Sequence, residues 1–250
     1  MLDQDNVIDV SVEPRQIPPM QGWQWIVSAF QLFKQSPTAW LGISGVFILA
    51  MIGISLLPIV GSLLSTLLGP VFLGGLMFAA QKQTRGETPL LVDLFAGFQQ
   101  RFAELLKVGV LYLFGTMLVV LLMAGLLAGA AYLGWLTIDK TVDTFAQMGA
   151  IWPVMILVLA AFAIVYSTYF YAPTLVMLQG YSAGEAMKLS FLAFWRNWQP
   201  ILVMSIIGGV LLLLAMLPML LGLIIALPVA LITSYVCYAD VFETSTEHDL

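Results

Sequence analysis

The stretch GWQWIVSAFQLFKQSPTAW, Gly22–Trp40, combines three tryptophans and two phenylalanines with one lysine, just before the first long apolar block of the chain. Apolar residues recur at helical spacing in it and polar residues lie opposite. The apolar set is Trp23, Ile26, Val27, Phe30 and Phe33, and the polar set is Gln24, Ser28, Gln31 and Gln35. The pattern predicts an amphipathic helix at a membrane interface. Ser36-Pro37 then offers a helix N-cap and first position, so a membrane span is expected to begin there.

The composition excludes a soluble protein. Of 250 residues, 61% are hydrophobic and 9% charged, with a mean hydropathy of +0.99, whereas a soluble domain carries roughly 25% charged residues. Four blocks lack Asp, Glu, Lys and Arg: Gln35–Gln81, Val108–Ile138, Thr144–Gly184 and Asn197–Ala239. A spanning helix needs about 20 apolar residues, so the first and last blocks each hold two spans and the second holds one. Thr144–Gly184 is long enough for one or two spans. Its polar ends favour a single span, which would cover Ile151–Leu178.

The predicted fold class is therefore an all-α integral membrane bundle of six transmembrane helices. The spans are expected at about 38–57, 60–80, 107–136, 151–178, 200–217 and 219–239, within one membrane domain at about 22–239. Residues 1–21 carry Asp3, Asp5, Asp9 and Glu13 against Arg15 alone. This segment is predicted to be a disordered acidic tail without a signal peptide. Residues 240–250 are predicted to be a second short acidic tail.

The basic residues predict the orientation. With six spans, one side holds Arg15, Lys34, Lys82, Arg85, Arg101, Lys107, Lys188 and Arg196, and the other side holds Lys140 between Asp139 and Asp143. Lysine and arginine in short loops stay in the cytoplasm. Both termini are therefore expected on the cytoplasmic side of a bacterial inner membrane. Two spans in Thr144–Gly184 would move Lys188 and Arg196 outside and weaken this bias.

The opening pattern recurs twice. Leu91–Lys107 and Ser182–Pro200 also read as amphipathic aromatic helices, each followed by two spans. Each unit has a Phe-x-x-Phe pair, and the second span of each contains a proline: Phe30/Phe33, Phe95/Phe98 and Phe191/Phe194, with Pro70, Pro173 and Pro228. We infer a threefold parallel repeat of one cytoplasmic interfacial helix and one helical hairpin. The register stays open, since Lys34 aligns with Trp195 or Arg196, and aromatic interface helices also precede spans in membrane proteins without repeats.

The lipid-interface candidates are the aromatic and basic residues of these three helices: Trp23, Trp25, Phe30, Phe33, Lys34, Phe95, Phe98, Arg101, Phe191, Phe194, Arg196 and Trp198. Basic residues at this level attract anionic lipids. Candidates for a cavity or hinge are Pro70, Pro173 and Pro228, which should kink their helices, with Tyr166 and Tyr169 in the densest polar patch of the spans. Static packing and an aromatic belt explain the same residues.

Residues for catalysis are scarce. The one histidine, His248, lies in the C-terminal tail, and the one cysteine, Cys237, is expected to pack in the last span. The six predicted spans carry no charge, which argues against an ion-coupled pump. Glu87 and Glu185 start amphipathic helices, where the helix dipole favours acids. The sequence predicts no catalytic residue, metal site, cofactor or nucleic-acid partner.

The run Gly22–Ser44 resembles the start of a family of uncharacterised bacterial inner-membrane proteins with an opening Gly-Trp-x-Trp motif. The matching residues are Gly22, Trp23, Trp25, Phe33, Lys34, Pro37 and Trp40. The layout is also distantly similar to membrane domains that accompany glycerophosphodiester phosphodiesterases. The resemblance implies a multi-helix inner-membrane fold and transfers no catalytic residue.

Two functions fit these features. The first is a non-enzymatic inner-membrane protein that organises lipid or acts as a scaffold for a membrane complex. Its partners would be membrane lipids, with anionic lipids favoured, and a protein partner or a second copy of the chain. The alternative is a transporter or flippase of a lipid-like or neutral apolar substrate, which needs a cavity that reaches the membrane midplane. A membrane enzyme ranks third because acid–base groups are missing.

Overall fold

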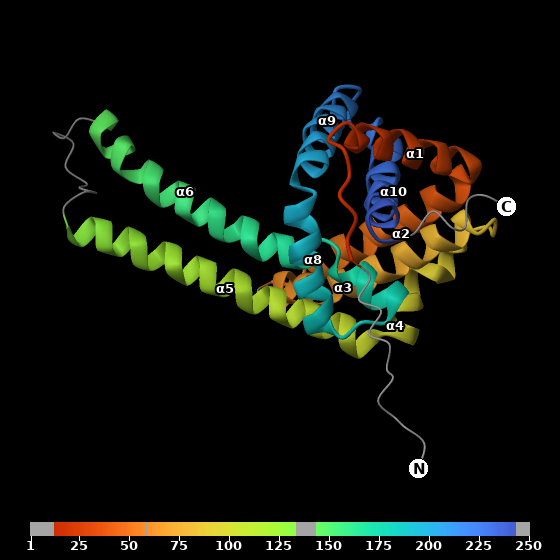
Figure 1. Cartoon of the computed structure of the whole chain (residues 1–250), viewed down its shortest axis with the longest axis horizontal. Coiled ribbons are helices and arrows are strands. Elements are labelled where there is room, and N and C mark those ends of the chain that lie inside the picture. Colours follow the sequence, from red (N-terminus) through yellow and green to blue (C-terminus); the bar gives the residue numbers. More distant parts are fainter. Residues whose placement is uncertain (1–12, 59, 134–143, 244–250) are drawn as a thin grey trace, which may run out of the picture.

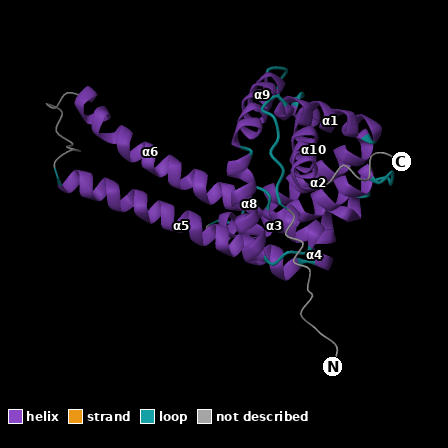
Figure 2. Cartoon of the chain, in the orientation of Figure 1, coloured by secondary structure: helices purple, strands orange, loops and turns teal. Residues whose placement is uncertain are grey.

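The computed structural model describes residues 13–58, 60–133 and 144–243, and within them the chain is helical with no strand (Figure 2). The α-helices are α1 Gln21–Gln35, α2 Pro37–Ser55, α3 Val60–Thr84, α4 Ala96–Gln100, α5 Phe102–Tyr132, α6 Thr144–Tyr169, α7 Ala172–Thr174, α8 Ala183–Arg196, α9 Trp198–Met216 and α10 Leu223–Phe242. A 3₁₀ turn, η1 Leu91–Phe95, precedes α4, and a π turn, η2 Leu175–Gln179, follows α7. The all-α prediction is confirmed.

Within the described residues, six helical segments are long and apolar enough to cross a membrane, which agrees with the predicted number. They are Pro37–Ser55, Val60–Thr84, Phe102–Tyr132, Trp152–Gln179, Trp198–Met216 and Leu223–Phe242. The third begins at Phe102 rather than at 107, and the sixth runs from Leu223 to Phe242 rather than over 219–239. Lys140, Asp139 and Asp143, on which half of the charge comparison depends, lie outside the described residues.

The helices form three hairpins, in which α2 contacts α3, α5 contacts α6 and α9 contacts α10. The long α5–α6 hairpin projects away from the other two hairpins (Figure 1). Each hairpin follows a short helical element, namely α1, η1 with α4, and α8. The order of elements thus repeats three times, as the repeated sequence pattern predicts.

Buried residues gather at one end of the hairpins. The core contains the first turn or two of α2, α5 and α9 with the last turns of α3 and α10, represented by Trp40, Leu105, Ile201, Leu76 and Tyr238. At the opposite end Leu56, Tyr132 and Leu217 are 75%, 92% and 77% exposed. The short helical elements lie at the buried end. Exposed apolar side chains at the far end fit a lipid solvent, because lipid tails are as apolar as leucine.

The residues that join each short helix to its hairpin share one backbone conformation. Ser36 has φ −142° and ψ 59°, Arg101 has φ −136° and ψ 28°, and Asn197 has φ −119° and ψ 27°. In each case the carbonyl accepts the N–H of the residue four positions later, which is the first bond of the span: Trp40 at 3.2 Å, Leu105 at 3.0 Å and Ile201 at 3.2 Å. We call Ser36, Arg101 and Asn197 the hinge residues.

Alignment on the hinge residues supports the repeat and resolves its register. The two phenylalanines of every Phe-x-x-Phe pair lie six and three residues before a hinge residue, and the three residues four positions after a hinge residue are all buried. Lys34 aligns with Trp195 rather than with Arg196, because each precedes its hinge residue by two positions. The three basic interface candidates Lys34, Arg101 and Arg196 therefore occupy non-equivalent positions.

The expected amphipathic helix over Leu91–Lys107 is wrong as a single helix. Asp93 accepts the Leu90 N–H at 2.7 Å and pairs with Lys82 at 3.3 Å, which holds a tight 3₁₀ turn at its start. This turn packs directly on α3, since a Cβ on Gly75 would overlap the carbonyl of Leu94. The start of this segment is therefore held by close backbone contact with α3, which the sequence pattern did not indicate.

The two tails are shorter than expected. Residues 13–20, which the sequence assigns to a disordered tail, form an extended strap against the buried end of the bundle. Arg15 donates its N–H to Val241 at 3.0 Å, and the Asn197 amide accepts the Ile17 N–H at 2.8 Å and donates to the Arg15 carbonyl at 2.9 Å. At the other terminus α10 continues through Asp240 to Phe242. Residues 1–12 and 244–250, including His248, lie outside the described residues.

Candidate functional site

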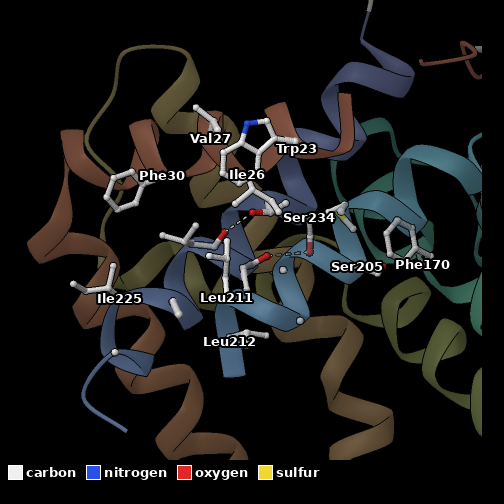
Figure 3. A pocket seen from close by; sticks show the side chains of 18 of the residues that line it. Trp23, Ile26, Val27, Phe30, Phe170, Ser205, Leu211, Leu212, Ile225 and Ser234 are labelled. Carbon is white, nitrogen blue, oxygen red and sulfur yellow. Dashed lines mark hydrogen bonds between the residues drawn. The ribbon is translucent and has the colours of Figure 1, made fainter. Parts of the chain in front are cut away.

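A cavity of about 800 Å³ lies between α1, the α9–α10 hairpin and the end of α6 (Figure 3). Its wall consists of Trp23, Ile26, Val27 and Phe30 from α1, Tyr166 and Phe170 from the end of α6, Met204, Ser205, Gly208, Gly209, Leu211 and Leu212 from α9, and Gly222, Ile225, Ala226, Val229, Ala230, Thr233 and Ser234 at the start of α10 and along it. Ligand pockets typically measure 300–1,000 Å³, so this volume suits a ligand. We call it the α1–α9–α10 cavity.

The apolar stripe of α1 forms one wall of this cavity. Trp23, Ile26, Val27 and Phe30 follow one another at intervals of three, one and three residues, so they share a helix face. Trp23 and Phe30 are 38% and 43% exposed, and Ile26 is 8% exposed, so the stripe runs from the rim of the cavity to its floor. The face that the sequence predicted to meet lipid thus meets an opening within the protein.

Two contacts hold α1 against the α9–α10 hairpin. Gly22 lies against α9, where a Cβ would overlap the carbonyl oxygen of Pro200. Trp25 donates its indole N–H to the Asp240 carboxylate of α10 at 2.7 Å, and its side chain is 1% exposed. Trp25 and Phe33, at 6% exposure, were both expected at the lipid interface; both are buried in the protein, so that expectation is corrected. An amphipathic pattern does not distinguish burial against protein from burial in lipid.

Glycines on α9 give the cavity its width. Gly208 and Gly209 face the cavity, and a Cβ on Gly209 would find no atom within 4 Å, while one on Gly208 would reach only the Ile26 side chain at 3.9 Å. Ordinary side chains at these two positions would occupy the space between α9 and α1. The width of the cavity therefore depends on the absence of side chains at Gly208 and Gly209.

The serine and threonine hydroxyls on the wall donate to their own helices. The hydroxyls of Ser205, Thr233 and Ser234 donate to carbonyls four residues back, at 2.7, 2.7 and 3.4 Å. Such bonds satisfy the hydroxyl donors locally. The wall thus offers mainly apolar contact, which suits a hydrocarbon chain better than a polar metabolite and provides no acid–base pair for chemistry.

One cation stands beside the cavity. The Lys34 ammonium lies 5.2 Å from the centroid of the Phe30 ring, which itself lines the cavity. Lys34 is exposed, and neither of the two ion pairs between described side chains, Lys82–Asp93 and Lys107–Glu104, uses it. An aromatic face holds a cation only weakly at an exposed site, so this charge remains available to an anionic group.

The other interface candidates lie apart from the cavity wall. Phe95 and Phe98 pack around Phe72 of α3, with ring centroids 6.1 and 5.0 Å away. Phe194 packs on Phe170 and Tyr166, and Phe191 on Trp195. Arg101 lies over Gly180, whose φ of +76° favours glycine. Arg196 and Trp198 are exposed. Contact of these residues with lipid stays a prediction.

The tyrosines and prolines that the sequence suggested for a cavity or a flexible kink lie in different parts of the fold. Tyr166 lines the cavity, but Tyr169 packs on Tyr112 at a centroid distance of 4.5 Å, outside the wall. Pro70, Pro173 and Pro228 are buried and do not line the cavity. Pro70 and Pro228 lie inside α3 and α10, while Pro173 lies just after the end of α6. Whether the three proline kinks act as hinges or as static packing stays a prediction.

The break after α6 contains a contact that the sequence did not indicate. Tyr171 donates its N–H to the Ser190 hydroxyl at 2.9 Å, and that hydroxyl donates to the Ser167 carbonyl at 2.8 Å. In a regular helix Tyr171 would donate directly to Ser167. Ser190 of α8 is thus inserted into the hydrogen-bond ladder of α6, which is a recognised cause of a kink. Tyr171 also contacts the buried Cys237 of α10, with its hydroxyl 3.0 Å from the sulfur.

Comparison with known proteins supports a membrane assignment. Over 194 residues the chain is 27% identical to a probable inner membrane protein of Burkholderia thailandensis, and the match covers 70% of this chain and 67% of that protein. No family model and no solved structure matches the chain. With six apolar helices, this similarity indicates a multi-pass inner-membrane protein.

Proposed function

We propose that this chain is a non-enzymatic inner-membrane protein that binds a lipid-like molecule in the α1–α9–α10 cavity and thereby organises lipid, or a membrane complex, around itself. The observation that supports this role is an apolar cavity of about 800 Å³ whose serine and threonine hydroxyls are bonded to their own helices. Such a wall binds by shape and apolar contact. The described residues that line it supply no nucleophile paired with a base.

We further propose that the buried end of the bundle, with the three short helical elements, faces the cytoplasm. Basic residues at this end, such as Lys34, Arg85 and Arg196, then meet the anionic surface of the inner leaflet. A protein partner or a second copy of the chain would bind to the exposed apolar hairpins. The distant layout similarity to membrane domains that accompany glycerophosphodiester phosphodiesterases, which rests on the sequence pattern alone, would be compatible with such an accessory role.

The test is lipid retention with the cavity filled. The wild-type protein and Gly209→Leu are reconstituted in lipid discs, released gently and examined by native mass spectrometry. Gly209 faces open space, so leucine should fit without a clash and raise helix propensity. The matched control is Gly53→Leu in α2, where a Cβ also meets nothing within 4 Å and the cavity is not involved. Wild type and Gly53→Leu should retain a lipid that Gly209→Leu loses; equal retention in all three would refute the proposal.

The alternative, a transporter or flippase, is favoured by the length of the cavity. Its α9–α10 wall runs from Met204 to Leu212 and from Gly222 to Ser234, so it follows the hairpin over much of its length. Proteoliposomes with a fluorescent lipid in one leaflet would distinguish the two roles. Translocation that Gly209→Leu abolishes and Gly53→Leu preserves would favour transport. No translocation by protein that still retains lipid would favour the organising role.

A further inference from the structure

We propose that the occupant of the α1–α9–α10 cavity is an anionic phospholipid, with one acyl chain between α1, α9 and α10 and its phosphate bound by Lys34. This inference rests on the proposed function and adds the class of the ligand and the residue that selects it. Nothing in the apolar wall discriminates between headgroups, so selectivity must come from the rim.

Lys34 provides a positive charge beside the cavity. Phe30 links the two parts of the site, because its ring lines the cavity and also lies 5.2 Å from the Lys34 ammonium. A molecule whose chain packs along Phe30 therefore brings its polar end to Lys34. Gln31, one turn before Lys34, is exposed and adds an amide beside it.

Neighbouring carboxylates do not neutralise this charge. Asp240, which packs against α1, accepts the Trp25 indole at 2.7 Å, and Asp93 and Glu104 pair with Lys82 and Lys107. No ion pair between described side chains therefore uses the Lys34 ammonium. A headgroup with a net negative charge gains from it, whereas the ammonium of a zwitterionic headgroup is repelled, so the geometry favours an anionic lipid.

Lys34 lies at the depth at which a lipid headgroup would be expected. Leu32, two residues before it, accepts the Gln83 amide at 2.8 Å, and Gln83 also accepts the Trp40 indole at 2.6 Å. These contacts place Lys34 beside the start of α2 and the end of α3, where two spans leave the apolar region. Tryptophan is enriched at this depth of a membrane. The cavity extends from there along α9 and α10, in the direction that an acyl chain would take.

The experiment measures headgroup selectivity. Protein in discs of equal phosphatidylglycerol and phosphatidylcholine is released and the ratio of the two retained lipids is determined by native mass spectrometry. Wild type should enrich phosphatidylglycerol. Lys34→Gln should lower the ratio about fivefold, the equivalent of about 1 kcal/mol for one basic residue at an anionic surface, with the number of retained lipids unchanged. Lys34→Arg should restore the ratio.

Arg85→Gln is the matched control. It removes one exposed basic residue from the turn after α3, outside the cavity wall, and should leave the ratio at the wild-type value. An equal ratio in wild type, or a ratio that Lys34→Gln does not change, would overturn the inference about Lys34 while the proposed lipid binding stands. Loss of all lipid from wild type, or its retention by Gly209→Leu, would instead refute the proposed function.

Discussion

Replacing Ser190 with alanine tests whether its hydroxyl completes the hydrogen-bond ladder of α6. The side chain is 0% exposed and joins the Tyr171 N–H to the Ser167 carbonyl at 2.9 and 2.8 Å. Ser190→Ala leaves both backbone groups unpaired in the interior. One unsatisfied buried group costs about 1–3 kcal/mol, and hydrogen bonds within membrane proteins average about 0.6 kcal/mol. We therefore expect the free energy of unfolding to fall by roughly 1–3 kcal/mol.

The ladder cannot simply close after this substitution, because Pro173 follows two residues after Tyr171. Proline lacks an N–H and its ring clashes with the carbonyl four residues earlier, which opposes a straight helix. In a Pro173→Ala background the direct bond from Tyr171 to Ser167 becomes accessible. The cost of Ser190→Ala should then shrink, so a double-mutant cycle should show coupling between the two positions.

The assay is unfolding in mixed detergent–SDS micelles, followed by tryptophan fluorescence, with amide hydrogen exchange at Tyr171 as a local readout. Ser205→Ala is the matched control, since that hydroxyl donates only to the carbonyl of Ile201 in its own helix. Ser190→Ala should be clearly less stable than Ser205→Ala and should exchange the Tyr171 amide faster. Equal stability of the two variants and unchanged exchange would refute the bridging role.

Three further substitutions test how α1 and its neighbours are held. Gly22→Ala should force α1 away from α9 and cost about 1–3 kcal/mol by overpacking, whereas Gly184→Ala, with open space around it, should be neutral in the same unfolding assay. Trp25→Phe removes the 2.7 Å bond to the Asp240 carboxylate and should lower stability by about 1.5–3 kcal/mol; an undiminished unfolding midpoint would contradict this. Gln83→Leu removes the hydrogen bonds to Leu32 and Trp40 and should increase hydrogen exchange at the end of α1 and the start of α2; protection equal to wild type would show that these bonds are dispensable.

The all-α class and the number of spans could be predicted from the sequence because lipid imposes a simple rule. A helix that crosses a membrane must be apolar over its full length and satisfies its own backbone groups. The charge-free blocks therefore mark the spans, and a Ser36-Pro37 pair marks the start of one of them. The conformation shared by Ser36, Arg101 and Asn197 has no comparable sequence signal, since three different residues adopt it.

The partners of each helix face could not be predicted. The stripe of α1 is as apolar as that of a lipid-facing helix. The same helix nevertheless contacts α10, because Trp25 donates its indole N–H to Asp240, which lies 215 residues away in the sequence. A carboxylate near the end of a span gives no sign of which indole will reach it. Likewise, the pattern around Phe95 and Phe98 predicted an amphipathic helix at the membrane interface. In the structure the backbone at Leu94 lies directly against Gly75, so that a 3₁₀ turn packs on α3.

The cavity itself was only partly predictable. Tyr166 was singled out from a cluster of polar residues, and it does line the cavity. The glycines that open the cavity, Gly208 and Gly209, look like ordinary membrane-helix glycines in the sequence. Their role depends on the angle at which α1 crosses α9, which is set by long-range contacts and has no local signature.

The strap formed by residues 13–20 brings the start of the first repeat to the end of the third. Arg15 donates to Val241 at 3.0 Å, so the chain closes on itself at the buried end of the bundle. Three repeats arranged in a closed order have no obligatory first member. A circularly permuted chain that begins at the exposed Glu87, with a short linker between α10 and the strap, would keep the three hairpins whole and each in its present orientation across the membrane. The bundle should therefore assemble with its repeats in the order second, third, first.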